Sequence, residues 1–81
     1  MTDRHATVRT PLVSPDAVAA ALRPDNTAEM TTRVADGAVV TDIERDSTGG
    51  LRATVDDYLV NLRVADEVTT HAARFDNPNH E

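Results

Sequence analysis

Cysteine and tryptophan are absent from the 81-residue sequence, which has one tyrosine and one phenylalanine, Tyr58 and Phe75. The absence of cysteine excludes disulfide bonds and thiolate metal sites. With so few aromatic residues, the core must be built from valine, leucine, isoleucine, alanine and methionine. A chain of this length forms one small domain, and such domains often gain stability from a partner or a second copy. We therefore expect a thin core and an assembly with other chains.

Lysine is also absent: the 8 basic residues are all arginines, against 14 acidic residues, and the formal net charge is −6. A strongly hydrated acidic surface is typical of proteins adapted to concentrated salt, where exposed charges are screened over short distances. The codon usage of a GC-rich genome would also replace lysine by arginine, and the composition leaves both explanations open. The acidity argues against unaided binding of nucleic acid, which normally uses a basic face.

Long apolar runs and a signal peptide are missing as well, so a cytoplasmic protein is expected. Motifs of catalysis are missing too: there is no Gly-rich phosphate loop and no Gly-x-Ser-x-Gly sequence. Asp56 and Asp57 point to different sides of a predicted helix and do not form a catalytic pair. His71, Asp76 and His80 could be drawn as a metal site, but they lie in a polar tail without supporting residues. We expect no enzyme, no cofactor and no metal.

Three strands are predicted from alternating side chains and turn signals. Residues 5–10 alternate, with Ala6, Val8 and Thr10 on the inner side, and Pro11 ends the strand. Residues 30–35 and 38–44 flank Asp36-Gly37, a strong hairpin signal. The two-residue loop predicts that Val34 lies opposite Val39, Thr32 opposite Thr41 and Met30 opposite Ile43, all on the apolar face.

Two helices complete the domain. Ser14-Pro15-Asp16 is typical of a helix start, with the serine hydroxyl as cap, and the helix is predicted to run to Arg23 and end before Pro24. Its buried face is expected to hold Val18, Ala21 and Leu22, which leaves Ala19 and Ala20 outward. The second helix is predicted from Leu51 to about Thr70, with Ser47 or Thr48 as cap and Gly49-Gly50 allowing a sharp turn into it.

The order β-α-β-β-α predicts an α+β two-layer domain, in which both helices pack on one face of a three-stranded antiparallel sheet. The third strand is the longest and most apolar, so it is expected in the middle. The domain is predicted over residues 5–70, after a disordered start (residues 1–4) and before a polar tail (residues 71–81) that frays.

The second helix carries two apolar stripes. The first is a normal core stripe, formed by Leu51, Val55, Tyr58, Leu59, Leu62 and Ala65. The second lies nearly opposite and is formed by Ala53, Val60, Val64 and Val68, with a charged strip of Arg52, Asp56, Arg63 and Glu67 between the two. A two-layer domain offers this helix one core only, so the second stripe predicts an interface, although single surface valines are common. We expect partner contacts at Ala19, Ala20, Ala53, Val60, Val64 and Val68.

Three segments together resemble one family. They are Pro24-Asp25-Asn26, the strand pair from Met30 to Glu44 around Asp36-Gly37, and the helix that begins at Ser47 and contains LRATVDDYLVNL over residues 51–62. In this order they are similar to the Pcc-type small subunit of the KEOPS complex in its archaeal form, over residues 5 to about 69. The acidic, lysine-free composition would suit a halophilic archaeon. Nothing is transferred to the tail.

The resemblance implies the same fold and a function in tRNA processing. KEOPS forms threonylcarbamoyladenosine (t6A) next to the anticodon of tRNAs that read codons starting with A. The resemblance implies that the chemistry belongs to an ATPase-fold threonylcarbamoyltransferase subunit with a metal-bound active site. It also implies that the Pcc-type subunit is a non-catalytic homodimer that docks this catalytic subunit and helps to hold tRNA as part of the complex.

Two alternatives stay open at this stage. One is a stand-alone KH-like RNA-binding module, suggested by the element order, with phosphate contacts at Arg9, Arg33, Arg52 and Arg63. The acidic charge and the scarcity of stacking aromatics argue against it. The other is an adaptor in an unrelated assembly. The homodimer surface is also open: either an edge strand pairs with its copy, or the outer sheet face, formed by Thr7, Arg9, Thr31, Arg33 and Val40, stacks on another.

Overall fold

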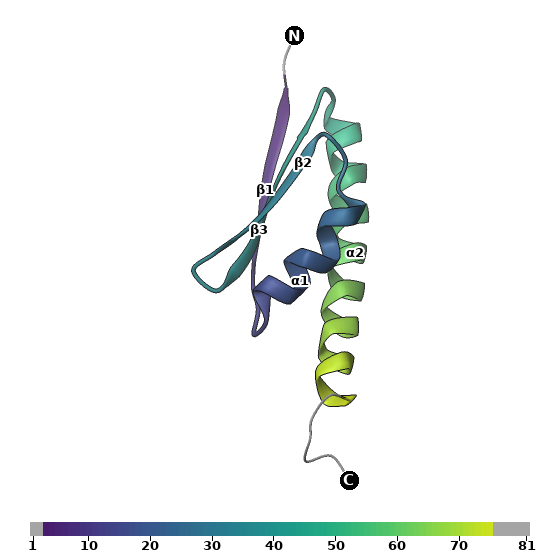
Figure 1. Ribbon diagram of the computed structural model, residues 1–81. Helices are drawn as coiled ribbons and strands as arrows, with labels where there is room; N and C mark the ends of the chain where they lie inside the picture. The colour runs from purple at the N-terminus through teal and green to yellow at the C-terminus, as the bar shows by residue number, and fades with distance from the viewer. Residues whose placement is uncertain (1–2, 76–81) are drawn as a thin grey trace.

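The structure, a computed structural model, describes residues 3–75, which fold as two layers (Figure 1). The described chain has three strands, two α-helices and one turn of 3₁₀-helix. In chain order the elements are β1 (Arg4–Pro11), α1 (Pro15–Leu22), η1 (Arg23–Asp25), β2 (Met30–Ala35), β3 (Ala38–Arg45) and α2 (Thr48–Phe75). The predicted β-α-β-β-α order is confirmed.

The sheet is antiparallel throughout, with the order β1-β3-β2, so β3 is the central strand as predicted. The turn between β2 and β3 has positive φ at both central residues, 52° at Asp36 and 76° at Gly37. Such a turn twists in the same sense as the strands it joins, which is why Asp-Gly fixes the register. Val34 pairs with Val39, Thr32 with Thr41 and Met30 with Ile43, and all three predicted pairs are confirmed.

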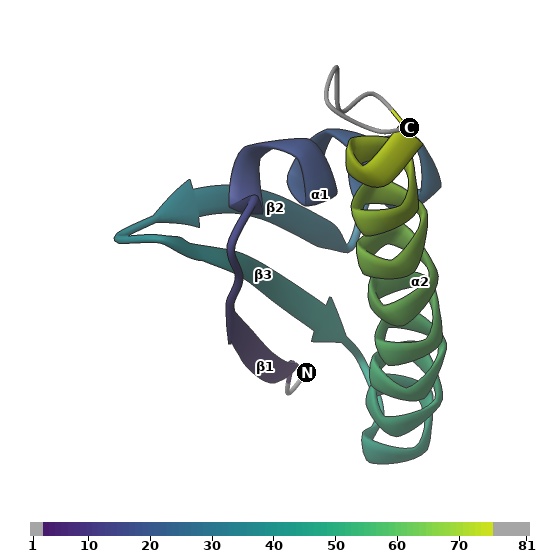
Figure 2. The same cartoon turned by 90° about the horizontal axis from the view of Figure 1, so that it is seen from below.

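Both helices cover the same face of this sheet (Figures 1 and 2). That face presents Val39 and Ile43 of β3. From the helix layer, Val18 and Leu22 of α1 and Tyr58 of α2 pack against these strand residues, and all five side chains are buried. Within residues 3–75, the opposite face of the sheet carries no helix (Figure 2). The two-layer architecture is therefore confirmed.

The start of α2 is fixed by side chains on both sides of the turn after β3. The backbone N–H of Gly50 donates to the Ser47 hydroxyl at 3.0 Å, which makes Ser47 the N-cap. A Cβ at Gly50 would lie 2.9 Å from the Ser47 Oγ, so this glycine leaves room for the cap. Arg45 Nη1 donates to the Thr54 hydroxyl, and Arg4 Nε donates to the Thr48 hydroxyl at 3.0 Å. These contacts tie β1 and β3 to the first turns of α2.

Several predicted boundaries need correction. β1 begins at Arg4, within the segment expected to be disordered. The Ser14 side chain makes no capping hydrogen bond, and only its carbonyl takes part, accepting from the N–H of Val18 at 3.2 Å. α1 ends at Leu22, and the chain tightens into η1.

α2 begins at Thr48, three residues earlier than predicted, and continues to Phe75, so residues 71–75 of the predicted tail belong to the helix. No proline lies between Thr48 and Pro78, and alanines at positions 72 and 73 favour helix, so nothing local stops α2 near Thr70. Figure 1 shows the last turns of α2 extending past the sheet. The rest of the predicted tail, residues 76–81, lies outside the described residues.

Candidate docking surface

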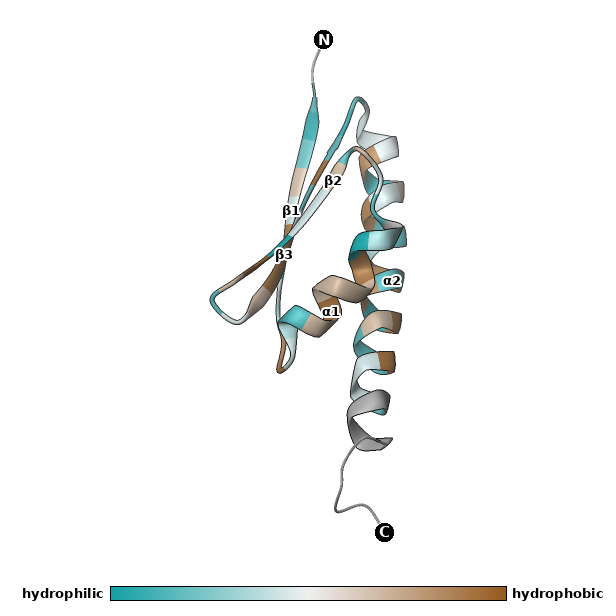
Figure 3. Ribbon diagram, viewed as in Figure 1, coloured by the Kyte–Doolittle hydropathy of each residue, from teal (hydrophilic) through white to brown (hydrophobic). Residues whose placement is uncertain are grey.

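The outward face of α2 carries a row of exposed valines. The side chains of Val60, Val64 and Val68 are 62%, 52% and 60% exposed. They recur every four residues, and Figure 3 shows apolar positions along the helix on its solvent side as well as toward the sheet. Ala53, two turns before Val60, is also exposed. The second apolar stripe predicted from the sequence is thus solvent-exposed in the isolated chain.

A groove between α1 and α2 borders this row. It is lined by Ala21 of α1 and by Asn61, Val64, Ala65 and Val68 of α2. Ala20, directly before Ala21 in α1, is also exposed. The short side chains on α1 leave space for a third helix to approach both helices at once. We call the set Ala20, Ala21, Ala53, Val60, Val64 and Val68 the docking face.

The prediction for Ala19 is wrong, because this side chain is 0% exposed and belongs to the core. Ala21, expected in the core, is exposed instead. Ala19 and Ala21 lie on either side of the buried pair Val18 and Leu22. Because both are alanines, the sequence shows no difference in polarity between these two sides of the helix. The hydrophobic pattern of α1 therefore did not determine which flank turns inward, and Ala21 replaces Ala19 on the docking face.

The prediction that Leu59 lies in the core is also wrong, since it is 44% exposed. Tyr58, Leu62 and Ala65 form the buried centre of α2, and Leu59 lies at the margin of that arc. The sheet has three strands in the described part of the chain, and no fourth strand there covers this margin. Leu59 shares its side of α2 with Asp66, two turns further on, which lines a pocket with the end of β1 and the residues that follow it (residues 11–14). An apolar residue is thus left exposed on the β1 side of α2.

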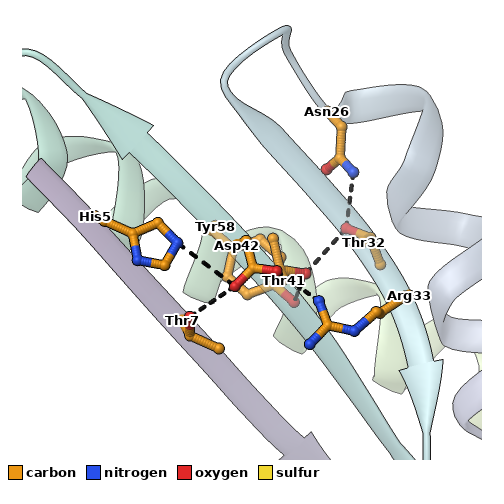
Figure 4. A network of polar contacts seen from close by, with 8 residues as sticks. All are labelled: His5, Thr7, Asn26, Thr32, Arg33, Thr41, Asp42 and Tyr58. Atoms are coloured by element: carbon orange, nitrogen blue, oxygen red, sulfur yellow. Dashed lines mark hydrogen bonds and ion pairs between the residues drawn. The ribbon is translucent and has the colours of Figure 1, made fainter. Parts of the chain in front are cut away.

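A chain of four polar side chains links α2 to the sheet; two of them, Thr41 and Tyr58, are buried, and Asn26 and Thr32 are half-buried (Figure 4). The Thr41 hydroxyl donates to the Tyr58 oxygen at 2.7 Å, and the Thr32 and Thr41 hydroxyls lie 2.9 Å apart. Asn26 Nδ2 donates to the Thr32 hydroxyl at 2.7 Å. Since Thr41 has one hydroxyl proton and directs it to Tyr58, Thr32 donates to Thr41. The chain runs from the segment after α1, across β2 and β3, to α2.

Burial raises the pKa of the Tyr58 hydroxyl, and the hydrogen bond from Thr41 acts in the opposite direction. Tyr58 is therefore neutral at physiological pH and acts as a hydrogen-bonding anchor. No buried side-chain nitrogen or oxygen in the described part of the chain lacks a partner. The sequence analysis placed Tyr58 in the core but did not identify this polar chain. The signal was Thr32 and Thr41, two hydroxyls facing each other on a largely apolar sheet face.

On the uncovered face of the sheet, a second polar cluster is centred on Asp42 (Figure 4). The Thr7 hydroxyl donates to Asp42 Oδ1 at 2.6 Å, and Arg33 Nη1 pairs with Oδ2. His5 Nε2 lies 3.6 Å from Oδ1. The hydrogen bond from Thr7 and then the contacts with Arg33 hold the pKa of the Asp42 carboxyl below its ordinary value. The cluster links all three strands through side chains.

The four arginines proposed as RNA contacts do not converge on one surface. Arg9 and Arg33 flank Val40 across the uncovered sheet face, where Arg33 is paired with Asp42. Arg52 and Arg63 lie on α2, in the other layer. Val40, although on this open face, is buried, so it is not available for stacking on a second sheet.

The described residues contain no group of three or more histidine, cysteine or acidic side chains that could hold a metal ion. His71 lies in α2, whereas Asp76 and His80, the other members of the hypothetical metal site, are outside the described residues. Within residues 3–75, no helix is long and apolar enough to cross a membrane.

Comparison with protein-family models, with curated proteins and with solved structures gave no match for this chain. The resemblance described above therefore stays a prediction that rests on its own residues.

Proposed function

We propose that this chain is a non-catalytic docking subunit, and that α2 binds its main partner through the docking face. The observation that carries the proposal is the exposure of Val60, Val64 and Val68 beside an open groove between two helices. A fully buried valine side chain contributes about 1.5–3 kcal/mol, so covering the exposed half of each would contribute about 1 kcal/mol. A partner that covers all three valines and the groove would gain several times this amount.

The partner proposed is the catalytic threonylcarbamoyltransferase subunit of a KEOPS-type complex, which makes the function a contribution to t6A formation in tRNA. The segments that resemble the Pcc-type subunit support this choice, and the groove suits a helical partner. In this proposal the chain supplies no catalytic group, and tRNA is held only by the assembled complex.

The proposal includes a homodimer, for which the exposed edge of β1 is the better of the two surfaces considered. β1 has 8 residues and pairs on one side only, with β3. A long unpaired edge is a template for pairing with another strand, and two copies of β1 can pair about a twofold axis. Leu59, exposed on the β1 side of α2, would then meet the second copy. Stacking of the outer sheet faces is disfavoured, because Arg9, Asp42 and Arg33 occupy that face and Val40 is buried beneath its neighbours.

The alternative, a stand-alone RNA-binding module, has no single observation in its favour. The candidate arginines are divided between the two layers, and Arg33 is neutralised by Asp42. A titration of the isolated chain with tRNA distinguishes the two functions. Tight binding without a partner would favour the RNA-binding module.

The direct test is Val64→Asp, assayed by co-purification with the catalytic subunit. Docking would bury the new carboxylate without a partner, so we expect binding to be lost. Val13→Asp is the matched control, since Val13 is 101% exposed in the segment after β1 and outside the docking face. Val13→Asp should bind as the wild type does, and circular dichroism should show both variants folded. Undiminished binding by a folded Val64→Asp variant would contradict the proposal.

A further inference from the structure

One charged side chain lies inside the apolar row of α2. Asp57 follows Ala53 by four residues and precedes Val60 by three and Val64 by seven. Seven residues are nearly two full turns, so Asp57 and Val64 differ in direction by only about 20° around the helix. Asp57 is exposed, as are the three valines. Any surface that covers Ala53 and Val60 together therefore also covers Asp57.

No basic residue lies one turn before or after Asp57 on α2. The positions three and four residues away on either side are Ala53, Thr54, Val60 and Asn61. Among the described residues, no ion pair or side-chain hydrogen bond involves Asp57. Asp56 differs in this respect: Arg52 lies four residues before it, at the spacing where helix side chains meet, and Arg63 lies seven after it. In the described part of the free chain, the exposed Asp57 carboxylate thus has no ion-pair partner.

Docking removes the water around the Asp57 carboxylate. A carboxylate taken out of water without a hydrogen-bonded counter-charge is strongly unfavourable, and this would offset the gain from the valines. A partner that presented only apolar side chains would therefore bind poorly here. An arginine or lysine on the partner, placed opposite Asp57, would compensate the buried charge and fix the register of the complex.

On this basis we propose that the docking face receives an amphipathic helix with a basic residue in its apolar face. Its apolar side chains pack against Val60, Val64 and Val68 and enter the groove next to Ala21, and its basic residue pairs with Asp57. Asp57 is thus the specificity-determining residue of the surface, since it admits cationic helices and rejects neutral or acidic ones. This inference rests on the proposed function and adds the chemistry of the partner.

The chain offers a matched pair of positions for the test. Asp56 and Asp57 are the same residue, adjacent in sequence and both exposed, but Asp56 lies about 80° from Val64 around the helix, in the charged strip with Arg52 and Arg63. The affinity of purified full-length chain for the purified catalytic subunit is measured by titration calorimetry for the wild type and for Asp57→Asn, Asp57→Arg, Asp56→Asn and Asp56→Arg. Circular dichroism checks that the helix content of each variant equals that of the wild type.

We expect Asp57→Asn to weaken binding about 30-fold or more, because it leaves the partner's cation buried and unpaired, and Asp57→Arg to weaken it further. The Asp56 variants should stay within about threefold of the wild type, as is usual for an exposed charge. If the wild type binds and Asp57→Asn binds equally well or more tightly, the inference is overturned while the proposed function stands. If the wild type does not bind the catalytic subunit at all, the proposed function fails, and this inference with it.

Discussion

The buried hydrogen bond between Thr41 and Tyr58 allows a quantitative test of how α2 is held on the sheet. Both side chains are buried, and their oxygens are 2.7 Å apart. Thr41→Val keeps the shape of the side chain but leaves the Tyr58 hydroxyl without its donor in a site that water does not reach. A buried polar group that loses its partner costs about 1–3 kcal/mol. Tyr58→Phe removes the acceptor of this hydrogen bond and leaves the Thr41 hydroxyl without a group to donate to.

The double variant Thr41→Val/Tyr58→Phe separates this cost from general damage to the core. It removes both partners of this hydrogen bond together, so neither is left unpaired by the loss of the other. Thr32 loses its acceptor in Thr41→Val and in the double variant alike, so this loss cancels in the comparison. We expect each single variant to lose about 2 kcal/mol of unfolding free energy, and the double variant to lose at least 1 kcal/mol less than the sum of the two. For a domain of this size, each 1 kcal/mol corresponds to a shift of about 4–8 °C in Tm.

The assay is thermal and urea unfolding followed by circular dichroism. All variants are compared at one protein concentration, because a dimer makes Tm depend on concentration. If the losses of the two single variants add to within about 0.5 kcal/mol in the double variant, the two residues are not coupled, and the polar chain does not hold α2 as described.

Two further perturbations test the core of α1 and the Asp42 cluster. Ala19→Leu should lower the unfolding free energy by about 1–3 kcal/mol, because this site is fully buried. Ala20→Leu, at the adjacent exposed position, should change it by less than about 0.5 kcal/mol. Equal effects of the two variants in urea unfolding would contradict the assignment of Ala19 to the buried side of α1. The pKa of Asp42 is lowered in the folded chain by Thr7 and Arg33, so its contribution to stability is present above its unfolded pKa and is lost as the pH falls from about 4 through the folded pKa. Asp42→Asn should therefore reduce the dependence of Tm on pH below about pH 4, and an unchanged acid profile would contradict this role.

The sheet was predictable from sequence because its signals are local and agree with one another. Asp36-Gly37 fixes the loop length, the loop length fixes the register, and the register places Val34 and Val39 on the face that the alternation marks as apolar. The position of β3 in the centre followed from its apolar content. The exposed row on α2 was predictable for a similar reason, since a two-layer domain can bury only one side of a helix.

The wrong predictions concern positions where neighbouring residues differ little in hydrophobicity or where distant segments decide the outcome. α1 has 8 residues and four alanines, so rotating it slightly changes which alanine is buried without changing its apolar pattern. Leu59 is apolar and was assigned to the core, but its exposure depends on how far three strands extend beneath α2. The polar chain from Asn26 to Tyr58 depends on distances between four separate segments, which no local spacing reveals.

The accessibility of individual valine methyl groups tests the central claim most directly. In the isolated chain, a soluble paramagnetic agent should broaden the methyl NMR signals of Val60, Val64 and Val68 as it broadens those of Val13, because all four side chains are exposed. After addition of the catalytic subunit, the account predicts that the three α2 valines become protected while Val13 stays accessible. If a complex forms and these three valines remain as accessible as Val13, the partner binds elsewhere and the docking face is wrong.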